Sequence, residues 1–283
     1  MKIESLPKIT PKQKQIINLL YSFRFLTRIQ IQTMMKHKDK KTINLWLKDL
    51  RSKDYICWIY NKDHFADKTK PAIYYMGING IRHLRNLPFA PEDGLAIRYR
   101  DNERSQSFID SCLDIANCCI ELDDTRHASY HHTTCYYYET RADYQDERYY
   151  DLMNDSELIN PDLCFHKCET DELADPNSVQ SSYILEIFEA TLPHYRLRKR
   201  LKNYVQYFED EIDEWNERTG NPRPTMLLVC ATLTDLIYAK QRTRGLISED
   251  WDRDDKDRPD VRFTTIDKLR RYNVLTKEIW EQA

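Results

Sequence analysis

Glycine is scarce in this sequence, with 5 residues among 283. No GxGxxG or GxxxxGK pattern occurs, which excludes the glycine-rich loops that cradle phosphates in nucleotide-binding folds. Long apolar runs are also missing, because the longest, such as residues 226–231, stay far below the roughly 18 apolar residues of a membrane helix. With no cleavable signal at the start, the sequence predicts a cytoplasmic protein without a membrane partner.

The eight cysteines do not have the pattern of a disulfide framework. Such frameworks concentrate in small secreted domains, whereas this chain is long and carries no export signal. Cys164 and Cys168 flank His166, but no second pair of Cys or His stands at zinc spacing. The sequence therefore predicts reduced, buried thiols and no zinc site.

What is present suffices for real hydrophobic cores. The hydrophobic fraction is 41% and the aromatic fraction 12%, which excludes a fully disordered chain, and the length fits about two domains.

Charge is distributed unevenly between the two parts of the chain. Residues 1–87 carry 18 Lys/Arg and 6 Asp/Glu, a difference of +12, and the remainder carries 25 and 40, a difference of −15. An asymmetry of this size predicts that the amino-terminal part meets a polyanion.

Residues 1–87 begin with the pattern of a helix-turn-helix. Thr10 and Thr27 each start a capping box, which predicts two helices, the second of them short. A third helix, from about Lys40 to Lys53, has apolar residues at spacings of three and four and basic residues on the opposite face. A long helix, a short helix and an amphipathic helix follow one another in helix-turn-helix order.

Two strands rich in aromatic residues follow, at residues 55–60 and 73–76. The loop between them carries lysines, so the hairpin would be the wing of a winged helix, and a closing helix spans Gly77–Leu87. Residues 1–87 are therefore predicted to be a winged-helix DNA-binding domain, joined by a linker at residues 88–99 to the rest of the chain.

The expected partner of this domain is double-stranded DNA. A helix fits the major groove, where polar side chains reach base edges, while lysines of a wing hold phosphates. Winged helices often bind paired half-sites, so a homodimer is one expected arrangement. The alternative is a winged helix that serves only protein interaction or dimerisation. The predicted DNA-binding residues are Lys38, Lys40, Lys41, Asn44, Lys48, Arg51, Lys62, Lys68 and Lys70.

Residues 100–283 are predicted to form an α/β domain. The expected order is helix, three strands, helix, strand, helix and strand, and a helix between strands implies a mixed sheet that is covered on both faces. Together with the first domain this predicts an α+β or α/β fold class.

Two carboxylates stand out in the second domain. Asp162 begins one strand and Glu186 lies on the adjacent strand among apolar residues, where an acid must be paired, protonated or bound to a cation. Two acids from neighbouring strands can hold Mg²⁺, which would activate water for attack on a phosphodiester. The alternative is that both acids lie at exposed strand ends or pair with Lys199 and Lys202.

The whole chain resembles the replication-relaxation family of bacterial plasmids and other mobile elements. The resemblance rests on residues 19–27, on residues 74–80, and on Pro161-Asp162 followed by residues 185–191 and 202–204. It implies a DNA-binding protein that acts in replication, transfer or transcription control. It also implies a carboxy-terminal domain similar to the PD-(D/E)xK, or restriction-endonuclease-like, nuclease fold.

In that nuclease-like pattern Asp162 and Glu186 would be catalytic residues and ligands of Mg²⁺. The position two residues after Glu186 is Lys in active nucleases and is Phe188 here, although Lys199 or Lys202 of the next helix would replace it. The first hypothesis is therefore a DNA-binding protein with a degenerate nuclease-like domain. The alternatives are a metal-dependent DNA endonuclease and a non-enzymatic adaptor whose acidic domain binds another protein.

Overall fold

The computed structural model has an α+β fold, which confirms the predicted class. It divides into two compact units, described residues 6–120 and described residues 121–144 with 159–283. None of the helices in the described parts of the chain is long and apolar enough to cross a membrane. The structure describes residues 6–60, 70–88, 92–125, 133–144, 159–170, 179–210, 215, 217, 220–250 and 258–283.

The first unit opens with three helices and a small antiparallel sheet, whose strand order is β1-β3-β2. Both predicted capping boxes are formed, since the Thr10 and Thr27 side chains accept hydrogen bonds from the third residue of the helix that each one begins. In chain order the elements are α1 (Pro11–Phe23), β1 (Leu26–Thr27), α2 (Arg28–Met34), α3 (Lys40–Ser52), β2 (Ile56–Ile59), β3 (Ile73–Met76) and α5 (Ile78–Arg85).

Apolar stripes on α1 and α3 form the core of this unit. Ile16 and Leu20 of α1 and Ile43, Leu47 and Leu50 of α3 are almost completely buried. The spacings of three and four that put each set on one helix face explain why these segments are helical and why they pack together.

The first unit extends beyond the predicted linker at residues 88–99, because α6 (Glu92–Arg98), the 3₁₀ turn η1 (Asp101–Glu103) and most of α7 (Gln106–Thr125) belong to it. Arg98 is buried, and its guanidinium donates a 2.6 Å hydrogen bond to the carbonyl of Tyr21. The buried Asp101 carboxylate forms an ion pair with Arg24. These contacts hold the segment against the end of α1. The boundary between the two units lies after Ile120.

The second unit is built on a mixed six-stranded sheet in the order β4-β5-β6-β7-β8-β9, in which β6, β7 and β8 are parallel and the other pairs antiparallel. The predicted strands and the long helices between them are present, but the structure adds a short helix at Arg141–Tyr144 after the first strand, and a helix at Ile266–Arg271, a 3₁₀ turn at Lys277–Ile279 and the short β9 after the last predicted strand. The strands are β4 (Thr133–Thr140), β5 (Leu163–Thr170), β6 (Val179–Ile187), β7 (Thr225–Cys230), β8 (Val261–Thr265) and β9 (Glu281–Gln282).

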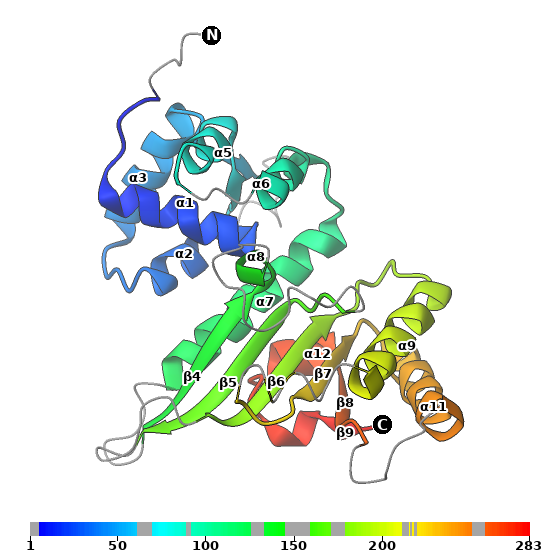
Figure 1. Ribbon diagram of the computed structural model, residues 1–283. Helices are drawn as coiled ribbons and strands as arrows, with labels where there is room; N and C mark the ends of the chain where they lie inside the picture. Colours follow the sequence, from blue (N-terminus) through cyan, green and yellow to red (C-terminus); the bar gives the residue numbers. More distant parts are fainter. Residues whose placement is uncertain are drawn as a thin grey trace. The chain divides into compact units, whose positions relative to one another are not determined.

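Helices cover both faces of this sheet (Figure 1). On one face α9 (His194–Asp210) and α11 (Leu233–Asp250) lie side by side over a core that includes Ile184, Leu228 and Trp215. On the other face α12 (Ile266–Arg271) packs against β7 and β8. The remaining elements are α8 (Arg141–Tyr144), which follows β4, and the 3₁₀ turn η3 (Lys277–Ile279).

Candidate functional site

The structure brings Asp162 and Glu186 together on the sheet face that α9 covers. Leu163 of β5 pairs with Leu185 of β6 in an antiparallel register, which places the preceding Asp162 opposite Glu186. The Asp162 backbone N–H donates to the Leu185 carbonyl at 3.0 Å. Its carboxylate Oδ2 accepts a 2.8 Å hydrogen bond from the Ile187 N–H. Backbone pairing alone therefore sets the two acids side by side.

Each acid is paired with an arginine. Asp162 Oδ1 lies 2.8 Å from Nη2 of Arg141, the first residue of α8. The same guanidinium also donates to the carbonyls of Asn160 and Pro161. Glu186 Oε1 accepts a 2.5 Å hydrogen bond from Nη1 of Arg200 in the second turn of α9. The site is thus a network of two acids and two arginines.

Burial dominates the electrostatics of Glu186. Its side chain is 4% exposed, whereas that of Arg200 is 42% exposed. Burial raises the pKa of Glu186 to about 7, although Arg200 opposes the rise. The Asp162 carboxylate raises the Glu186 pKa further, while the hydroxyl of Tyr204 lowers it. Tyr204 is itself buried, and that burial, together with Glu186, raises the Tyr204 pKa well above its usual value.

A cavity of about 200 Å³ opens beside this network. Its lining is mostly polar, which distinguishes it from the apolar core on the same face of the sheet. The cavity can hold several water molecules or a small polar group. It is lined by Arg141, Ile159, Asn160, Glu186, Arg200, Asn203 and Tyr204.

The donor set does not fit a resident Mg²⁺. Both oxygens of Asp162 already accept hydrogen bonds, and Glu186 offers one oxygen to Arg200. Mg²⁺ needs near-octahedral oxygen ligands, and no group of three or more Asp, Glu, His or Cys side chains that could hold a metal ion occurs in the described ranges. Phe188, at the position of the nuclease lysine, is buried in the core beneath α9. Arginine side chains, rather than a metal ion, balance the charges of Asp162 and Glu186 in this arrangement.

The alternative in which Lys199 and Lys202 pair with the two acids is not the arrangement that the structure shows. Lys199 and Lys202 are exposed on α9, and the basic residue of this helix that contacts Glu186 is Arg200. Helical periodicity explains the difference, because Arg200 lies beside the buried Leu197 and Tyr204, while Lys199 points away from the sheet. The helical spacing of the apolar residues Leu197 and Tyr204 could have predicted that Arg200, and not Lys199, lies next to the sheet. No comparable local pattern in the sequence pointed to Arg141.

In the first unit α3 presents the predicted polar face. Lys41, Asn44 and Lys48 are exposed, opposite the buried Ile43 and Leu47. Lys38 and Lys40, which flank the helix start, and Lys70, which precedes β3, are also exposed. The remaining two predicted lysines, Lys62 and Lys68, lie outside the described residues.

Arg51 is held differently from the other predicted DNA contacts. It is half-buried, and its guanidinium carbon lies 3.5 Å from the centre of the Trp58 ring, a cation–π contact. Tyr60 stacks on the same indole at 5.4 Å. Sequence reasoning missed Leu45, whose side chain is 65% exposed on α3 between Asn44 and Lys48 and offers an apolar contact there.

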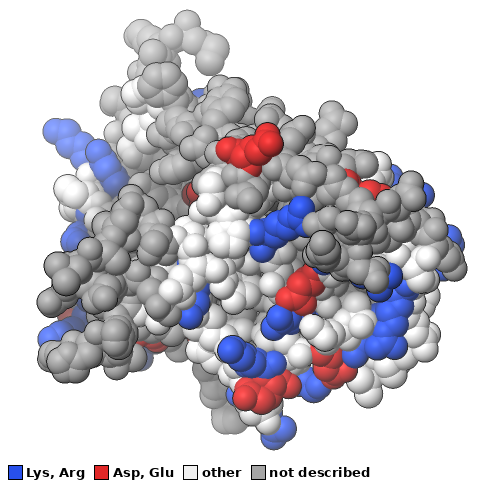
Figure 2. Space-filling model, turned by 60° about the horizontal axis from the view of Figure 1, so that its bottom comes forward, with Lys and Arg blue, Asp and Glu red and all other residues white. Residues whose placement is uncertain are grey.

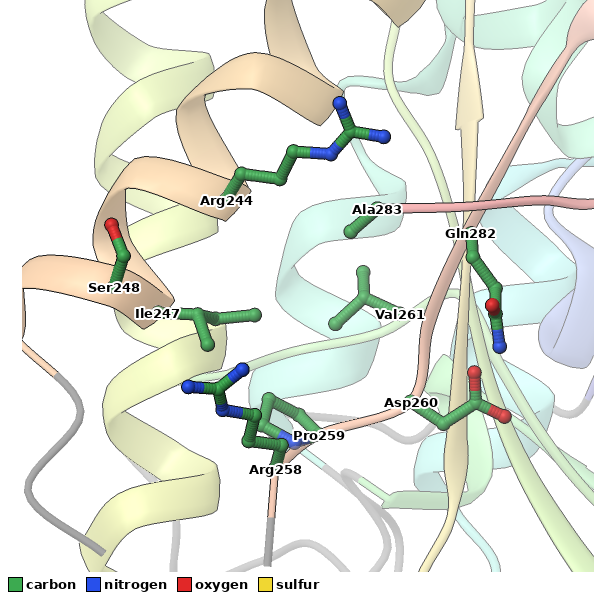
Figure 3. Close-up of a pocket in the computed structure, with 9 residues that line it drawn as sticks. All are labelled: Arg244, Ile247, Ser248, Arg258, Pro259, Asp260, Val261, Gln282 and Ala283. Atoms are coloured by element: carbon green, nitrogen blue, oxygen red, sulfur yellow. The ribbon is translucent and has the colours of Figure 1, made fainter. Parts of the chain in front are cut away.

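A larger cavity of about 400 Å³ lies elsewhere in the second unit, between α11 and β8 (Figure 3). Its acid, Asp260, is engaged by Arg262 at 2.6 Å and by the hydroxyl of Thr225 at 3.1 Å. None of the predicted site residues that the structure describes lines it. The lining consists of Arg244, Ile247, Ser248, Arg258, Pro259, Asp260, Val261, Gln282 and Ala283.

Comparison with known proteins gives one result that bears on identity. Neither the comparison with curated proteins nor that with solved structures gave a match. A family model described as replication-relaxation matches residues 17–223, which include the second half of α1, all of α3 and the network around Asp162 and Glu186. Because the match covers well over half of the sequence, the chain belongs to the replication-relaxation family, which indicates a role in the replication or transfer of a plasmid or another mobile element.

Proposed function

We propose that this protein binds double-stranded DNA through its first unit, and that this unit is a winged helix. The order of α1, β1, α2, α3, β2 and β3, with its three-stranded antiparallel sheet, supports the assignment. In this arrangement α3 is the helix that enters the major groove. The proposed activity is sequence-directed binding in the replication, transfer or transcription control of a mobile element.

The observation that carries the proposal is the positive charge on the exposed face of α3, which no ion pair among the described residues neutralises. Lys41 and Lys48 are exposed, while the acids at this helix are engaged elsewhere. Asp39 caps the helix by accepting from backbone N–H groups, and the Thr42 hydroxyl and these N–H groups lower the Asp39 pKa. Asp49 accepts from Lys53 at 2.7 Å and from Gln13 at 2.6 Å, away from the exposed face.

Asn44 and Leu45 lie between these lysines and complete the contact surface. An Asn side chain can form two hydrogen bonds to the edge of adenine, and an exposed Leu can meet the methyl group of thymine. The lysines would hold phosphates and fix the register of the helix in the groove. The same short stretch therefore combines positioning contacts with groups that can read bases.

The test is duplex binding as a function of salt concentration, followed by fluorescence anisotropy. Lys41→Ala with Lys48→Ala should weaken binding and should reduce the slope of log K against log[salt] by about 1.8, at about 0.9 for each phosphate contact. Lys12→Ala with Lys14→Ala, which removes two exposed charges from α1, is the matched control. Unchanged affinity and slope in the α3 variant would mean that α3 is not the DNA-binding helix.

We further propose that the second unit does not cleave DNA with Mg²⁺, because arginines occupy the positions around its two acids. Incubation of supercoiled DNA with the protein and Mg²⁺ or Mn²⁺ should leave the DNA intact. Nicking that requires the metal and is lost in Asp162→Ala would contradict this proposal and would establish the endonuclease alternative. The adaptor alternative predicts neither nicking nor duplex binding.

A further inference from the structure

Helix α9 carries a concentration of positive charge within the otherwise acidic second part of the chain. Residues 194–208 include five Lys or Arg and no Asp or Glu. The acids of α9, Glu209 and Asp210, stand at its end. Arg200 is accounted for by its contact with Glu186, which leaves four cations without an assigned role.

The four remaining cations are on the outer side of the helix. Leu197, Leu201 and Val205 form its buried stripe, and the cations flank or oppose that stripe. Lys and Arg side chains are visible along the right-hand side of the face shown in Figure 2, the side on which α9 and α11 lie in Figure 1. The exposed cations are Arg196, Arg198, Lys199 and Lys202.

Helix stability does not explain this distribution of charge. The helix macrodipole favours acids near the amino terminus and cations near the carboxyl terminus. In α9 the order is reversed, since cations fill the first turns and Glu209 and Asp210 occupy the end. The charges therefore weaken the helix that carries them.

Internal ion pairing does not explain it either. Other cations of this unit are paired, for example Lys268 with Glu281 and Arg262 with Asp260. No ion pair in the described part of the chain includes any of the four exposed cations of α9. A cluster of unpaired cations on one surface is typical of a binding site for a polyanion.

We propose that α9 forms a second DNA-binding surface, which holds the phosphate backbone of a duplex independently of its sequence. This inference rests on the proposed function, because the duplex is the partner already assigned to α3. Residues 196–202 span about 9 Å along the helix axis. Each strand of duplex DNA carries about one phosphate per 3.4 Å of the helix axis, so this span matches about two to three phosphates of one strand. Cations at this spacing contact phosphates and read no bases.

The exposed aromatic ring at the start of α9 fits the same role. Tyr195 is 68% exposed, and Arg196 Nε donates to its hydroxyl at 3.1 Å. This contact orients the Arg196 guanidinium at the surface. A tyrosine hydroxyl is also one of the groups that bind phosphate oxygens.

The experiment compares three double variants of the full chain on one duplex over a range of salt concentrations. Lys199→Ala with Lys202→Ala removes two exposed cations from α9. Arg271→Ala with Lys277→Ala removes two exposed cations from α12 and η3, and serves as the charge-matched control. The α3 variant, Lys41→Ala with Lys48→Ala, reports on the first unit. Circular dichroism verifies that each variant is folded.

The α9 variant should bind more weakly than the wild type, with a salt slope reduced by about 1.8, and the loss should be the same for duplexes of different sequence. The control variant should retain the slope of the wild type. An α9 variant that matches the control would overturn the inference and leave the assignment to α3 intact. Loss in the α9 variant alone would support the α9 surface and overturn the α3 assignment, and absence of duplex binding by the wild type would overturn both.

Discussion

The substitution Glu186→Gln tests whether burial or the ion pair with Arg200 has the larger effect on the pKa of Glu186. The folded-state pKa of Glu186 is about 7, against an ordinary value of 4.5. Between these two values the folded state holds a proton that the unfolded state has lost, so stability from this group is fully present below pH 4.5 and is lost as the pH rises through 7. At 1.36 kcal/mol per pH unit the full effect is about 3 kcal/mol.

Glutamine has the same shape and cannot ionise, so the variant lacks this dependence on pH. The free energy of unfolding should be measured by urea denaturation and circular dichroism from pH 5 to pH 8, with a separate transition fitted for each unit. The wild-type value minus the variant value should fall by about 2 to 3 kcal/mol over this range. A difference that is constant, or that grows with pH, would show that the pair with Arg200 outweighs burial.

Glu281→Gln is a control with the opposite sign. Hydrogen bonds from Lys268 and Lys240 lower the pKa of Glu281, so its contribution to stability is present above the ordinary value of 4.5 and is lost as the pH falls. For this variant the wild-type value minus the variant value should rise as the pH increases from 3 to about 5 and should stay nearly level from pH 5 to pH 8. The two carboxylates therefore separate the effect of burial from that of pairing within one unit.

Three further predictions concern stability and thiol access. Asp101→Asn removes the buried charge that pairs with arginine in the first unit and should lower its free energy of unfolding by about 3–5 kcal/mol, measured by denaturation; a loss below 1 kcal/mol would contradict this role. Gly80→Ala places a Cβ 2.4 Å from a backbone oxygen and should destabilise the folded protein by about 1–3 kcal/mol. Gly245→Ala lies in open space within α11 and should stabilise the folded protein by about 0.5–1 kcal/mol. Equal melting temperatures of the two variants would refute both expectations. All eight cysteines are free and six are buried, so a thiol reagent should label at most the two half-buried thiols before unfolding, and rapid labelling of more would contradict the packing.

The arrangement around Glu186 bears on the predicted nuclease-like pattern. The strands place Asp162 and Glu186 next to each other, as a metal site requires. The surroundings then neutralise the acids with guanidinium groups and with partial protonation of Glu186. An arginine next to a buried acid satisfies both charges without a metal cation.

Local chemistry in the sequence was sufficient for most of the secondary structure, although it did not predict α6, α8 or α12. The capping boxes at Thr10 and Thr27, the apolar stripe of α3 and the order of strands in the second unit all depend on residues a few positions apart. Hydrogen bonds of caps and the periodicities of helices and strands act at this range. The proximity of Asp162 and Glu186 followed in the same way, since consecutive strands usually pair.

Tertiary structure alone decided how the charges are matched. Arg141 and Asp162 are 21 positions apart, and α6 and α7 join the first unit through Asp101, which is 77 positions from Arg24. Which cation reaches a buried acid depends on the direction and burial of each side chain, so Arg200 meets Glu186 while its neighbour Lys199 stays in solvent. Sequence spacing carries no information on a partner such as Arg141, because desolvation and distance in space, rather than order along the chain, set the energy of an ion pair.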